Sequence, residues 1–550
     1  MTYSNLRWLN EASQNFLDRE YLIPGQSVEQ RIKEIADRAE EILKIEGYSK
    51  KLEDYIRKGW ISPSTPIWTN FGTKRGLPIS CFGSYIPDSV EGILKSANEV
   101  GMMCKHGGGT SGYFGGVRPR GSVITNNGIS NGTKPFLKYF EDTSQTISQG
   151  SVRRGYFSGY IDIDHADIDE WLQIRGEGDL IQHITWGVCV ASNWIKEMKE
   201  GDPEKRKRWA KVIQKRFETG IPYIFFTDNA NNHVSTPEVY KGKNLIKASQ
   251  MCTEIFLPSN EEETFVCDLA SMVVKYFEEW ENTDAVEVAI YLLDAAMTEF
   301  IEKAENLYGF ERAVKFAKRH RALGLGQMGY HTFLQSKMIP FEGLEARGWN
   351  IKIQKNIYEK AIEASKKLAI LYGEPELLKG TGLRNTTVCA IAPNTSSGFI
   401  MQVSPGIQME TGNIFIKDLA KGKFVIKNKY LEELLIEKGQ NTEEVWESIK
   451  INQGSVLQLD FLSDKEKLVF KTAREVSQKE VIIQAAHRQT YIDQGQSLNL
   501  FVQENISAKE ANELLMLAHD MGLKSLYYQF NVNAAQQLTK KLATCASCES

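Results

Sequence analysis

Short apolar runs alternate with longer amphipathic stretches along most of this 550-residue chain, and that alternation limits what the chain can fold into. The strand candidates are residues 183–191, 222–228, 386–393, 497–503 and 523–529. The helix candidates include residues 27–47, 51–59, 135–147, 204–220, 285–309 and 349–373. Strands that alternate with helices predict an α/β protein with a mostly parallel sheet or barrel. The residues after about 535 are small and polar, which is typical of a mobile tail.

Composition excludes several classes of protein. The net charge of −4 gives no global attraction to nucleic acid or to acidic membranes, so we expect neither as a partner. The N-terminus lacks the apolar core of a secretory signal, and no apolar run reaches membrane-spanning length. We therefore expect a cytoplasmic protein.

The eight cysteines are too sparse for a disulfide scaffold, and in a reducing compartment we expect buried, catalytic or metal-bound thiols. Cys545 and Cys548 form a single CxxC close to the C-terminus. A zinc ribbon requires a second CxxC or a pair of histidines at matching spacing, which this chain does not offer. The CxxC pattern lowers the pKa of one thiol and favours disulfide exchange, so we interpret this tail as a mobile exchange arm.

The stretch "QMCTE" places Cys252 two residues before Glu254. In an extended segment this spacing puts a thiol and a carboxylate on the same side of the chain. The residues alone allow a hydrolase nucleophile with its base, half of a metal site, or a radical site. A cysteine hydrolase is the weakest of these, because no histidine is placed to act as the base.

Three further motifs are ambiguous by themselves. "GLGQMG" (324–329) matches a dinucleotide fingerprint, but a basic helical stretch precedes it instead of a strand, which favours a tight turn. "APNTSSG" (392–398) fits a phosphate site at a helix start as well as an ordinary N-cap. The adjacent tyrosines Tyr527 and Tyr528 would face opposite ways in a strand, as ordinary packing residues do.

Taken together and in order, these motifs resemble the large catalytic subunit of class I ribonucleotide reductase, from about residue 62 to the C-terminus. The matching stretches are "SPSTPIWTNFGT", "ISCF", "GSVRRG", "CTE" with "CDLAS", "RALGLGQMG", "APNTSSG", "YIDQGQSLNLF", "SLYYQ" and "CASC". The resemblance implies a ten-stranded α/β barrel made of two parallel five-stranded halves, with a central finger loop. It divides the chain into a short helical N-terminal region (1–60), the barrel (61–535) and a redox-active tail (536–550).

The resemblance also assigns chemical roles. Cys252 becomes a thiyl radical that abstracts the ribose 3′ hydrogen, Glu254 is the general base on the 3′-hydroxyl, and Gln250 stands where the family usually has asparagine. Cys81 and Cys267 form the reducing pair, which Cys545 and Cys548 re-reduce before thioredoxin or glutaredoxin accepts the oxidation. Tyr527 and Tyr528 relay the radical from a separate, metal-containing small subunit.

The implied ligands are a ribonucleotide, for which diphosphates are the commoner class I substrate, and a dNTP or ATP that sets specificity. The implied substrate contacts are Thr65, Ser80, Gly109, Thr395, Ser396 and Ser397. The implied effector site includes Asp88, Arg118 and Arg153, because an arginine fork suits a phosphate. The family also implies a homodimer, and no metal or covalently bound cofactor is expected in this chain.

Three departures from the family pattern stand out. Gln250 is one methylene longer than the usual asparagine, and Thr125 stands where some members have an effector-loop arginine. Many large subunits begin with an ATP-cone, and too few residues precede "SPSTPIW" to form one. We therefore expect that dATP does not inhibit this subunit through its own N-terminus. Full inhibition in a dATP titration would contradict this.

Two alternatives remain at this point. An adenosylcobalamin-dependent reductase would use the thiols but leave the tyrosine pair without a role. A non-catalytic nucleotide-binding regulator would explain the glycine loops but not the thiols. The sequence does not identify the metal of the partner subunit, the oligomeric response to effectors, or the phosphorylation state of the substrate.

Overall fold

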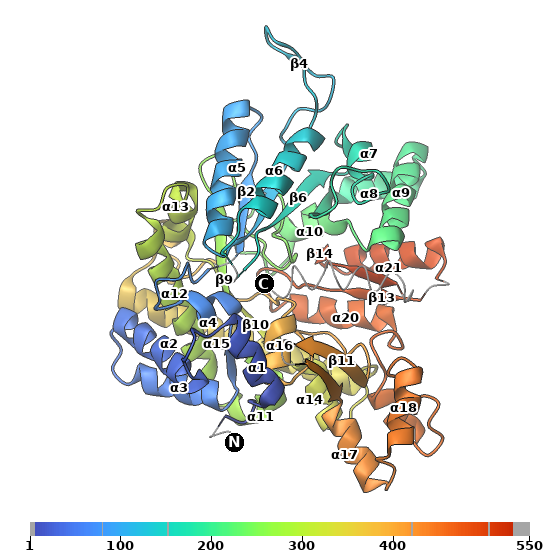
Figure 1. Cartoon of the computed structure of the whole chain (residues 1–550). Helices are drawn as coiled ribbons and strands as arrows, with labels where there is room; N and C mark the ends of the chain where they lie inside the picture. The colour runs from blue at the N-terminus through green and yellow to red at the C-terminus, as the bar shows by residue number, and fades with distance from the viewer. Residues whose placement is uncertain (1–5, 80, 151–152, 420–421, 504–505, 532–550) are drawn as a thin grey trace.

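The computed structural model describes residues 6–79, 81–150, 153–419, 422–503 and 506–531. Figure 1 shows a ring of strands at the centre, with helices outside it. Among the described residues, none of the helices combines the length and the apolar composition needed to cross a lipid bilayer.

The first half of the ring is five neighbouring strands, each parallel to the next. They are β2 (Cys81–Tyr85), β3 (Gly109–Tyr113), β6 (Tyr156–Asp162), β7 (Thr185–Val190) and β8 (Tyr223–Phe226). The elements around them are α5 (Val90–Lys105), β4 (Val123–Ile124), β5 (Gly128–Ile129), α6 (Lys134–Thr146), α7 (Ile168–Trp171), α8 (Ser192–Glu200), α9 (Pro203–Thr219) and α10 (Thr227–Asn232).

The second half is again parallel, but some of its strands are very short. β9 (Phe265–Val273) pairs with β10 (Leu323–Met328), and single parallel bridges then join Leu325 to Cys389 and Ile391 to Gln496. β13 (Leu500–Val502) pairs in parallel with β15 (Gln529–Asn531). Its helices are η1 (Val274–Tyr276), α11 (Phe277–Trp280), α12 (Ala285–Ala304), α13 (Glu311–His320), α14 (Tyr330–Ser336), α15 (Leu344–Tyr372), η2 (Glu376–Leu378), α16 (Thr395–Met401), α20 (Gln478–Gln489) and α21 (Ala508–Asp520).

Two antiparallel contacts close the ring. β2 pairs with β9 at one side, and β14 (Ser525–Leu526) pairs with β8 at the other. The expected barrel of two parallel five-stranded halves is therefore confirmed. Closing the sheet leaves few strand edges unpaired, which keeps the backbone hydrogen bonds satisfied around a buried interior.

The GLGQMG segment differs from the expected tight turn. Gly324 and Gly326 lie inside β10, and only Gly329 (φ +82°) makes the turn into α14. A Cβ at Gly326 would stand 2.5 Å from the carbonyl oxygen of Ala390. The glycines therefore allow the neighbouring chain to approach β10 closely. Because Gly324 and Gly326 lie inside the strand, they do not form the dinucleotide-binding loop that would follow it.

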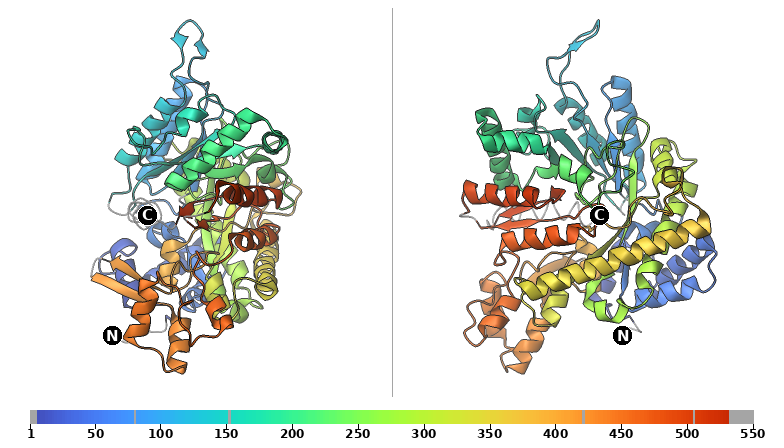
Figure 2. Two further views of the ribbon diagram at one scale, coloured as in Figure 1. Left: turned by 90° about the vertical axis from the view of Figure 1, so that its right-hand side faces the viewer. Right: turned by 180° about the vertical axis from the view of Figure 1, so that it is seen from behind.

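The N-terminal region is helical, as expected: α1 (Glu11–Glu20), α2 (Val28–Leu43) and α3 (Tyr48–Arg57) precede β1 (Ile61–Pro63) and α4 (Thr65–Asn70). Ser27 and Gln30 form a capping box that starts α2. The 29-residue α15 crosses the back of the molecule (Figure 2).

A smaller unit outside the ring has its own apolar cluster, which includes Leu431, Leu435, Trp446 and Ile449. It is made of β11 (Ile414–Leu419), β12 (Gly422–Lys427), α17 (Lys429–Glu437), α18 (Glu443–Ile451) and α19 (Asp464–Val469). Figure 1 shows these elements below the ring. The strand and helix candidates of the sequence did not separate this unit from the barrel.

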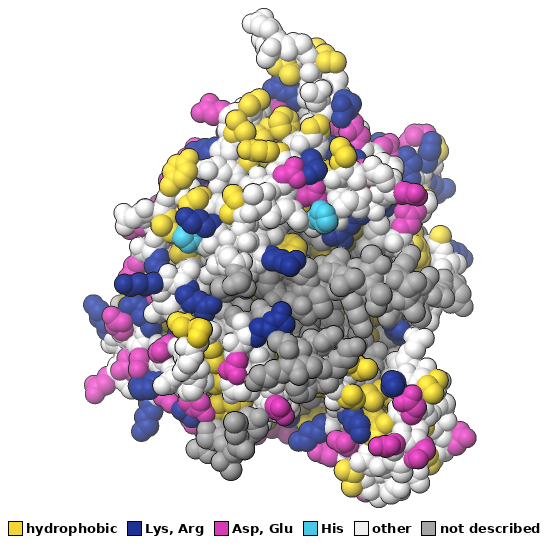
Figure 3. Space-filling model, viewed as in Figure 1, with side chains coloured by type: hydrophobic (Ala, Val, Ile, Leu, Met, Phe, Trp, Pro, Cys, Tyr) yellow, Lys and Arg dark blue, Asp and Glu magenta, His cyan; other side chains and the backbone are white. Residues whose placement is uncertain are grey.

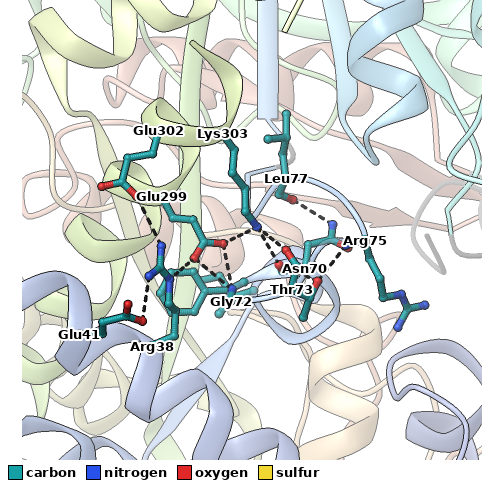
Figure 4. A network of polar contacts seen from close by, with 12 residues as sticks. Arg38, Glu41, Asn70, Gly72, Thr73, Arg75, Leu77, Glu299, Glu302 and Lys303 are labelled. Carbon is teal, nitrogen blue, oxygen red and sulfur yellow. Dashed lines mark hydrogen bonds and ion pairs between the residues drawn. The ribbon is translucent and has the colours of Figure 1, made fainter. Parts of the chain in front are cut away.

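A buried carboxylate holds the loop that leads into β2. Glu299 of α12 is fully buried and accepts hydrogen bonds from the Gly72 N–H at 2.9 Å and from Arg38 Nε at 2.7 Å. Lys303 pairs with the same carboxylate and donates to the carbonyl oxygen of Thr73 at 2.6 Å (Figure 4). Because the charge of Glu299 is fully paired, its burial fixes the loop between α4 and β2.

Candidate active site

A loop between α10 and β9 enters the barrel and is held by residues of both halves. The Tyr160 hydroxyl of β6 donates to the Gln250 carbonyl oxygen at 2.7 Å. From the other half, the Gly495 N–H donates to the Glu254 carbonyl oxygen at 2.9 Å, and Ser525 Oγ donates to the Thr253 carbonyl oxygen at 2.9 Å. This is the expected finger loop, fixed at its tip by its backbone.

The tip is a turn, so the expectation of an extended segment from Cys252 to Glu254 is wrong. The Thr253 N–H donates back to the Gln250 carbonyl oxygen at 3.2 Å, and Thr253 has a left-handed backbone (φ +64°). Such a conformation is unusual for a β-branched residue, and it persists here because the surrounding contacts hold the loop. The turn, and not strand alternation, sets the relative placement of Cys252 and Glu254.

Ser497 links these two residues. Its hydroxyl oxygen lies 2.6 Å from the Cys252 carbonyl oxygen and 2.9 Å from Glu254 Oε2. A hydroxyl has only one hydrogen. When Glu254 is protonated it can donate to Ser497, which then donates to the carbonyl of Cys252. Ser497 lies in "DQGQSLNLF", a motif of the resemblance whose individual residues carried no assigned role.

Glu254 has the electrostatics of a base that works near neutral pH. Its side chain is 1% exposed, and burial raises its pKa to about 7, although hydrogen bonds with Gln250 and Ser497 oppose the rise. A general base is most effective when its pKa lies near the working pH. The Gln250 side chain thus contacts other residues of its own loop: it hydrogen-bonds Glu254, and its amide oxygen lies 3.5 Å from the backbone nitrogen of Ile255.

Cys81 and Cys267 lie directly opposite each other, at paired positions of antiparallel β2 and β9. Opposed residues on antiparallel strands have Cα atoms roughly 4.5–5.5 Å apart, which is within the range of disulfides. Gln494 Nε2 donates to the Cys267 sulfur at 3.3 Å. Burial, Asp268 and the nearby Cys81 raise the pKa of Cys267 well above its ordinary value, so this thiol is protonated at neutral pH. Glu254 adds to the rise. Gln494 Oε1 also accepts from the Phe256 N–H at 3.0 Å, so the same side chain joins Cys267 to the finger loop.

Tyr527 and Tyr528 lie between β14 and β15. A strand would make them face opposite ways, but their rings lie against each other. Their ring centroids are 4.4 Å apart, with an angle of 57° between the planes. A third ring, which the sequence reasoning missed, contacts both: Tyr223 at the start of β8 lies 4.9 Å from Tyr527 and 5.1 Å from Tyr528. Burial, mainly, raises the pKa of Tyr223, and Tyr528 and Cys252 are among the charges that add to it. The Tyr527 N–H donates to the Leu498 carbonyl oxygen at 2.9 Å, next to Ser497, so the aromatic cluster lies beside a segment that contacts the finger loop.

The residues expected to contact substrate fall on two short helices and one strand. Thr65 begins α4, and Thr395, Ser396 and Ser397 form the first turn of α16. Gly109 begins β3, where it pairs in register with Cys81. Ser80 lies outside the described residues. The structure thus places Gly109 beside the reducing pair, whereas Thr65 and α16 meet through α1.

Two of the expected effector residues contact each other. Arg118 Nε lies 2.8 Å from Asp88 Oδ2, and the Arg118 N–H donates to Asp88 Oδ1 at 3.0 Å. Arg153 lies between α6 and β6, in an isolated bridge with Gln149. Cys545 and Cys548 lie outside the described residues.

Comparison with known proteins gives a consistent result. The family model "Ribonucleotide reductase, barrel domain" matches residues 79–206, 201–377 and 375–529. A ribonucleoside-diphosphate reductase large subunit of Invertebrate iridescent virus 3 is 32% identical and covers 88% of both chains. One from Arabidopsis thaliana is 27% identical and covers 88% of this chain and 70% of its own. The solved structure of the Actinobacillus ureae class Id ribonucleotide reductase alpha subunit is 51% identical, with a TM-score of 0.91 over 98% of this chain and 99% of that one.

Proposed function

The chain belongs to the ribonucleotide reductase family as a class I large subunit, and from this premise we propose how its own residues reduce ribonucleoside diphosphates. The reaction replaces the 2′-hydroxyl of the ribose by hydrogen. Cys252, carried on the finger loop, takes the 3′ hydrogen atom once its sulfur has lost an electron and a proton. The names of the relatives support a diphosphate substrate.

Glu254 then removes the proton of the 3′-hydroxyl. Its pKa of about 7 lets it hold that proton and release it near neutral pH. One thiol of the Cys81–Cys267 pair protonates the leaving 2′-oxygen, which departs as water. The pair supplies two electrons and two protons in all and becomes a disulfide, while the 3′ hydrogen returns from Cys252. The raised pKa of Cys267 keeps this thiol protonated at neutral pH, so its proton is present before the 2′-oxygen leaves.

The observation that carries this proposal is the joint position of Cys81, Cys267 and Glu254 inside one barrel. The two cysteines are paired across β2 and β9, and Gln494 contacts both the Cys267 sulfur and the Phe256 N–H of the loop that carries Glu254. The test is an assay of CDP reduction with a radical-generating small subunit and dithiothreitol. The expected product is dCDP. In a separate single turnover without dithiothreitol, one disulfide should form for each product. No dCDP with any small subunit would contradict the proposal.

We propose that the radical originates in a metal-containing small subunit and reaches Cys252 through Tyr527 and Tyr528. The contact of these rings with each other and with Tyr223 supports a continuous aromatic route. Arg216 of α9 helps to fix the backbone of this pair, because its Nη2 donates to the Tyr527 carbonyl oxygen at 3.2 Å. The tail cysteines Cys545 and Cys548 would re-reduce the disulfide and pass the oxidation to thioredoxin or glutaredoxin.

A groove between α9 and α21, with a volume of about 950 Å³, is a suitable docking site for the small subunit. Trp209, Ile213 and Phe217 supply apolar lining, and Lys199, Arg206 and Lys509 supply cations. This composition suits an acidic, amphipathic segment of the partner. Replacing Arg206 and Lys509 by glutamate should weaken binding of the small subunit, measured by titration, and leave nucleotide binding intact.

We also propose a homodimer that forms beside the effector site. Val90 and Leu94 of α5 are 64% and 50% exposed, and Tyr139 of α6 is 46% exposed. Figure 3 shows hydrophobic side chains gathered on the upper part of this face. Asp88, of the Asp88–Arg118 pair, comes two residues before Val90, so a dNTP or ATP held there would lie next to the interface. Sedimentation of Leu94→Asp, with and without dTTP, tests this arrangement.

A further inference from the structure

We propose that Tyr21 is a positioning residue for the substrate phosphate, because its hydroxyl orients the Thr65 side chain. The inference rests on the proposed reductase function and on the substrate contact that the family resemblance implies for Thr65, and it deepens both. The family resemblance gave no part in binding to the residues before β1, but the structure places one of them against Thr65.

The contact is short and enclosed. Tyr21 Oη lies 2.7 Å from Thr65 Oγ1, and the Tyr21 side chain is 2% exposed. Either oxygen can be the donor, but a phenol is the stronger acid of the two and the better donor. When Tyr21 donates, the hydrogen of Thr65 is left to point at an acceptor such as a phosphate oxygen. A donor that is itself hydrogen-bonded in this way is also a stronger one.

Tyr21 is held firmly enough to act in this way. It ends α1, where its N–H donates to the Leu17 carbonyl oxygen at 2.9 Å. Its own carbonyl oxygen accepts a hydrogen bond from Arg75 Nη1 at 3.2 Å. Its ring packs on Phe16, with the centroids 5.6 Å apart. These contacts fix both the backbone and the ring, so the hydroxyl loses little further freedom when substrate binds.

The segment that carries Tyr21 also braces α16, the helix that carries the expected substrate contacts Thr395, Ser396 and Ser397. Ser13 Oγ donates to the Ile400 carbonyl oxygen at 2.9 Å, and Gln402 Nε2 donates to the Trp8 carbonyl oxygen at 2.6 Å. The Phe16 ring, already against Tyr21, lies 5.6 Å from Phe399. Residues 6–22 therefore join α4 to α16, and Figure 1 shows α1 beside both helices.

The local charge suits an anionic ligand. Arg75 lies at this junction, and among the residues that the structure describes no carboxylate contributes to its pKa. Burial lowers the pKa of Arg75, which is the expected sign for a cation that has no counter-charge. A bound phosphate would provide that counter-charge.

The test is a double-mutant cycle of Tyr21→Phe and Thr65→Val, with CDP as the variable substrate. Tyr21→Phe removes only the hydroxyl, and we expect it to raise KM for CDP roughly two- to tenfold, as expected for the loss of one neutral hydrogen bond, with a smaller change in kcat. Thr65→Val should raise KM at least as much. Because Tyr21 acts through Thr65, the double variant should be no worse than Thr65→Val alone.

Tyr48→Phe is the matched control. Tyr48 is as buried as Tyr21, and its hydroxyl donates to the Val288 carbonyl oxygen at 2.7 Å, away from the site. Tyr48→Phe should leave KM for CDP unchanged. The melting temperature of each of the three single variants should be measured, so that a change in KM is not attributed to unfolding. An effect of Thr65→Val with none from Tyr21→Phe, or additive effects of the two, overturns the role of Tyr21. If neither variant changes KM, the assignment of Thr65 fails and the inference fails with it, whereas dCDP formation still tests the reductase function separately.

Discussion

Cys81 and Cys267 occupy directly opposed positions on antiparallel β2 and β9, and both are reduced thiols in this structure. Because opposed strand residues already have the Cα separation of a disulfide, we predict that one turnover without reductant joins these two cysteines. Peptide mapping after a single turnover should find this disulfide at about one per dCDP. Cys104 and Cys389, which are buried elsewhere, should stay reduced. A different pairing, or no disulfide, would contradict the assignment.

The rate should depend on the protonation of Glu254. Its pKa is raised to about 7 by burial, so kcat should rise with pH through about 7 as the carboxylate forms. The stability of the fold should change with pH in the opposite direction, because a raised pKa means that the folded state binds this proton more tightly than the unfolded state. The contribution of Glu254 to the free energy of unfolding is fully present below the unfolded-state pKa of 4.5 and is lost as pH rises through about 7. The rise in rate therefore does not reflect better folding.

Glu254→Gln identifies the group responsible for this pH dependence. Removing a general base typically costs about 10²–10⁴-fold in rate. The variant should lose that much kcat and also lose the rise near pH 7, as measured in a pH–rate series of CDP reduction. An unchanged pH profile would assign the titration to another group.

Ser497→Ala should affect both the position and the pKa of the base. The Ser497 hydroxyl contacts the Cys252 carbonyl and the Glu254 carboxyl, and its hydrogen bond lowers the pKa of Glu254. Without it, kcat should fall by roughly 10–100-fold, since small misplacements at reacting groups cost about this much. The rise in the pH–rate profile should also move to higher pH. Ser144→Ala, which removes a similarly buried hydroxyl from α6, is the control and should change neither quantity.

Glu299→Gln should destabilise the fold. The fully buried carboxylate pairs with Arg38 and Lys303. Removing its charge takes away the carboxylate that Lys303 contacts and leaves Arg38 with only its exposed partners, Glu41 and Glu302. We expect a loss of about 2–3 kcal/mol in the free energy of unfolding, at the lower end for buried pairs because both cations are partly exposed. Glu302→Gln is the control: this side chain is 58% exposed and pairs with the same Arg38, so its loss should stay below about 0.5 kcal/mol. Urea unfolding distinguishes the two.

The sequence predicted the barrel because its strands and helices alternate and because their motifs match a known family in order. It did not predict how the second half closes, since the strand candidate at residues 386–393 joins its neighbours only by single bridges, and the partners in those bridges are distant in the sequence. The glycines at 324 and 326 looked like a turn, but they lie in β10, where the approach of a neighbouring chain requires them. Close approach between distant segments leaves no local periodicity.

At the site, residue types were more predictable than geometry. The Cys252–Glu254 spacing suggested an extended segment, whereas a turn with a left-handed Thr253 sets their placement, stabilised by Ser497 and Gly495 from about 240 residues further on. Tyr223 was missed because a tyrosine in an apolar strand resembles a packing residue. Its contact with Tyr527 and Tyr528 depends on the antiparallel pairing of β8 with β14, which only the fold reveals.

The central claim is that an electron leaves Cys252 through the paired rings of Tyr527 and Tyr528. The most direct measurement is CDP reduction by Tyr528→Phe with the radical-generating small subunit, beside the unaltered protein with adenosylcobalamin alone. Phenylalanine preserves the packing of a ring 4.4 Å from Tyr527 but cannot pass on the radical. We predict loss of turnover in the variant, with CDP binding retained, and no turnover with adenosylcobalamin. Turnover of Tyr528→Phe at the unaltered rate, or turnover supported by adenosylcobalamin, would contradict the relay.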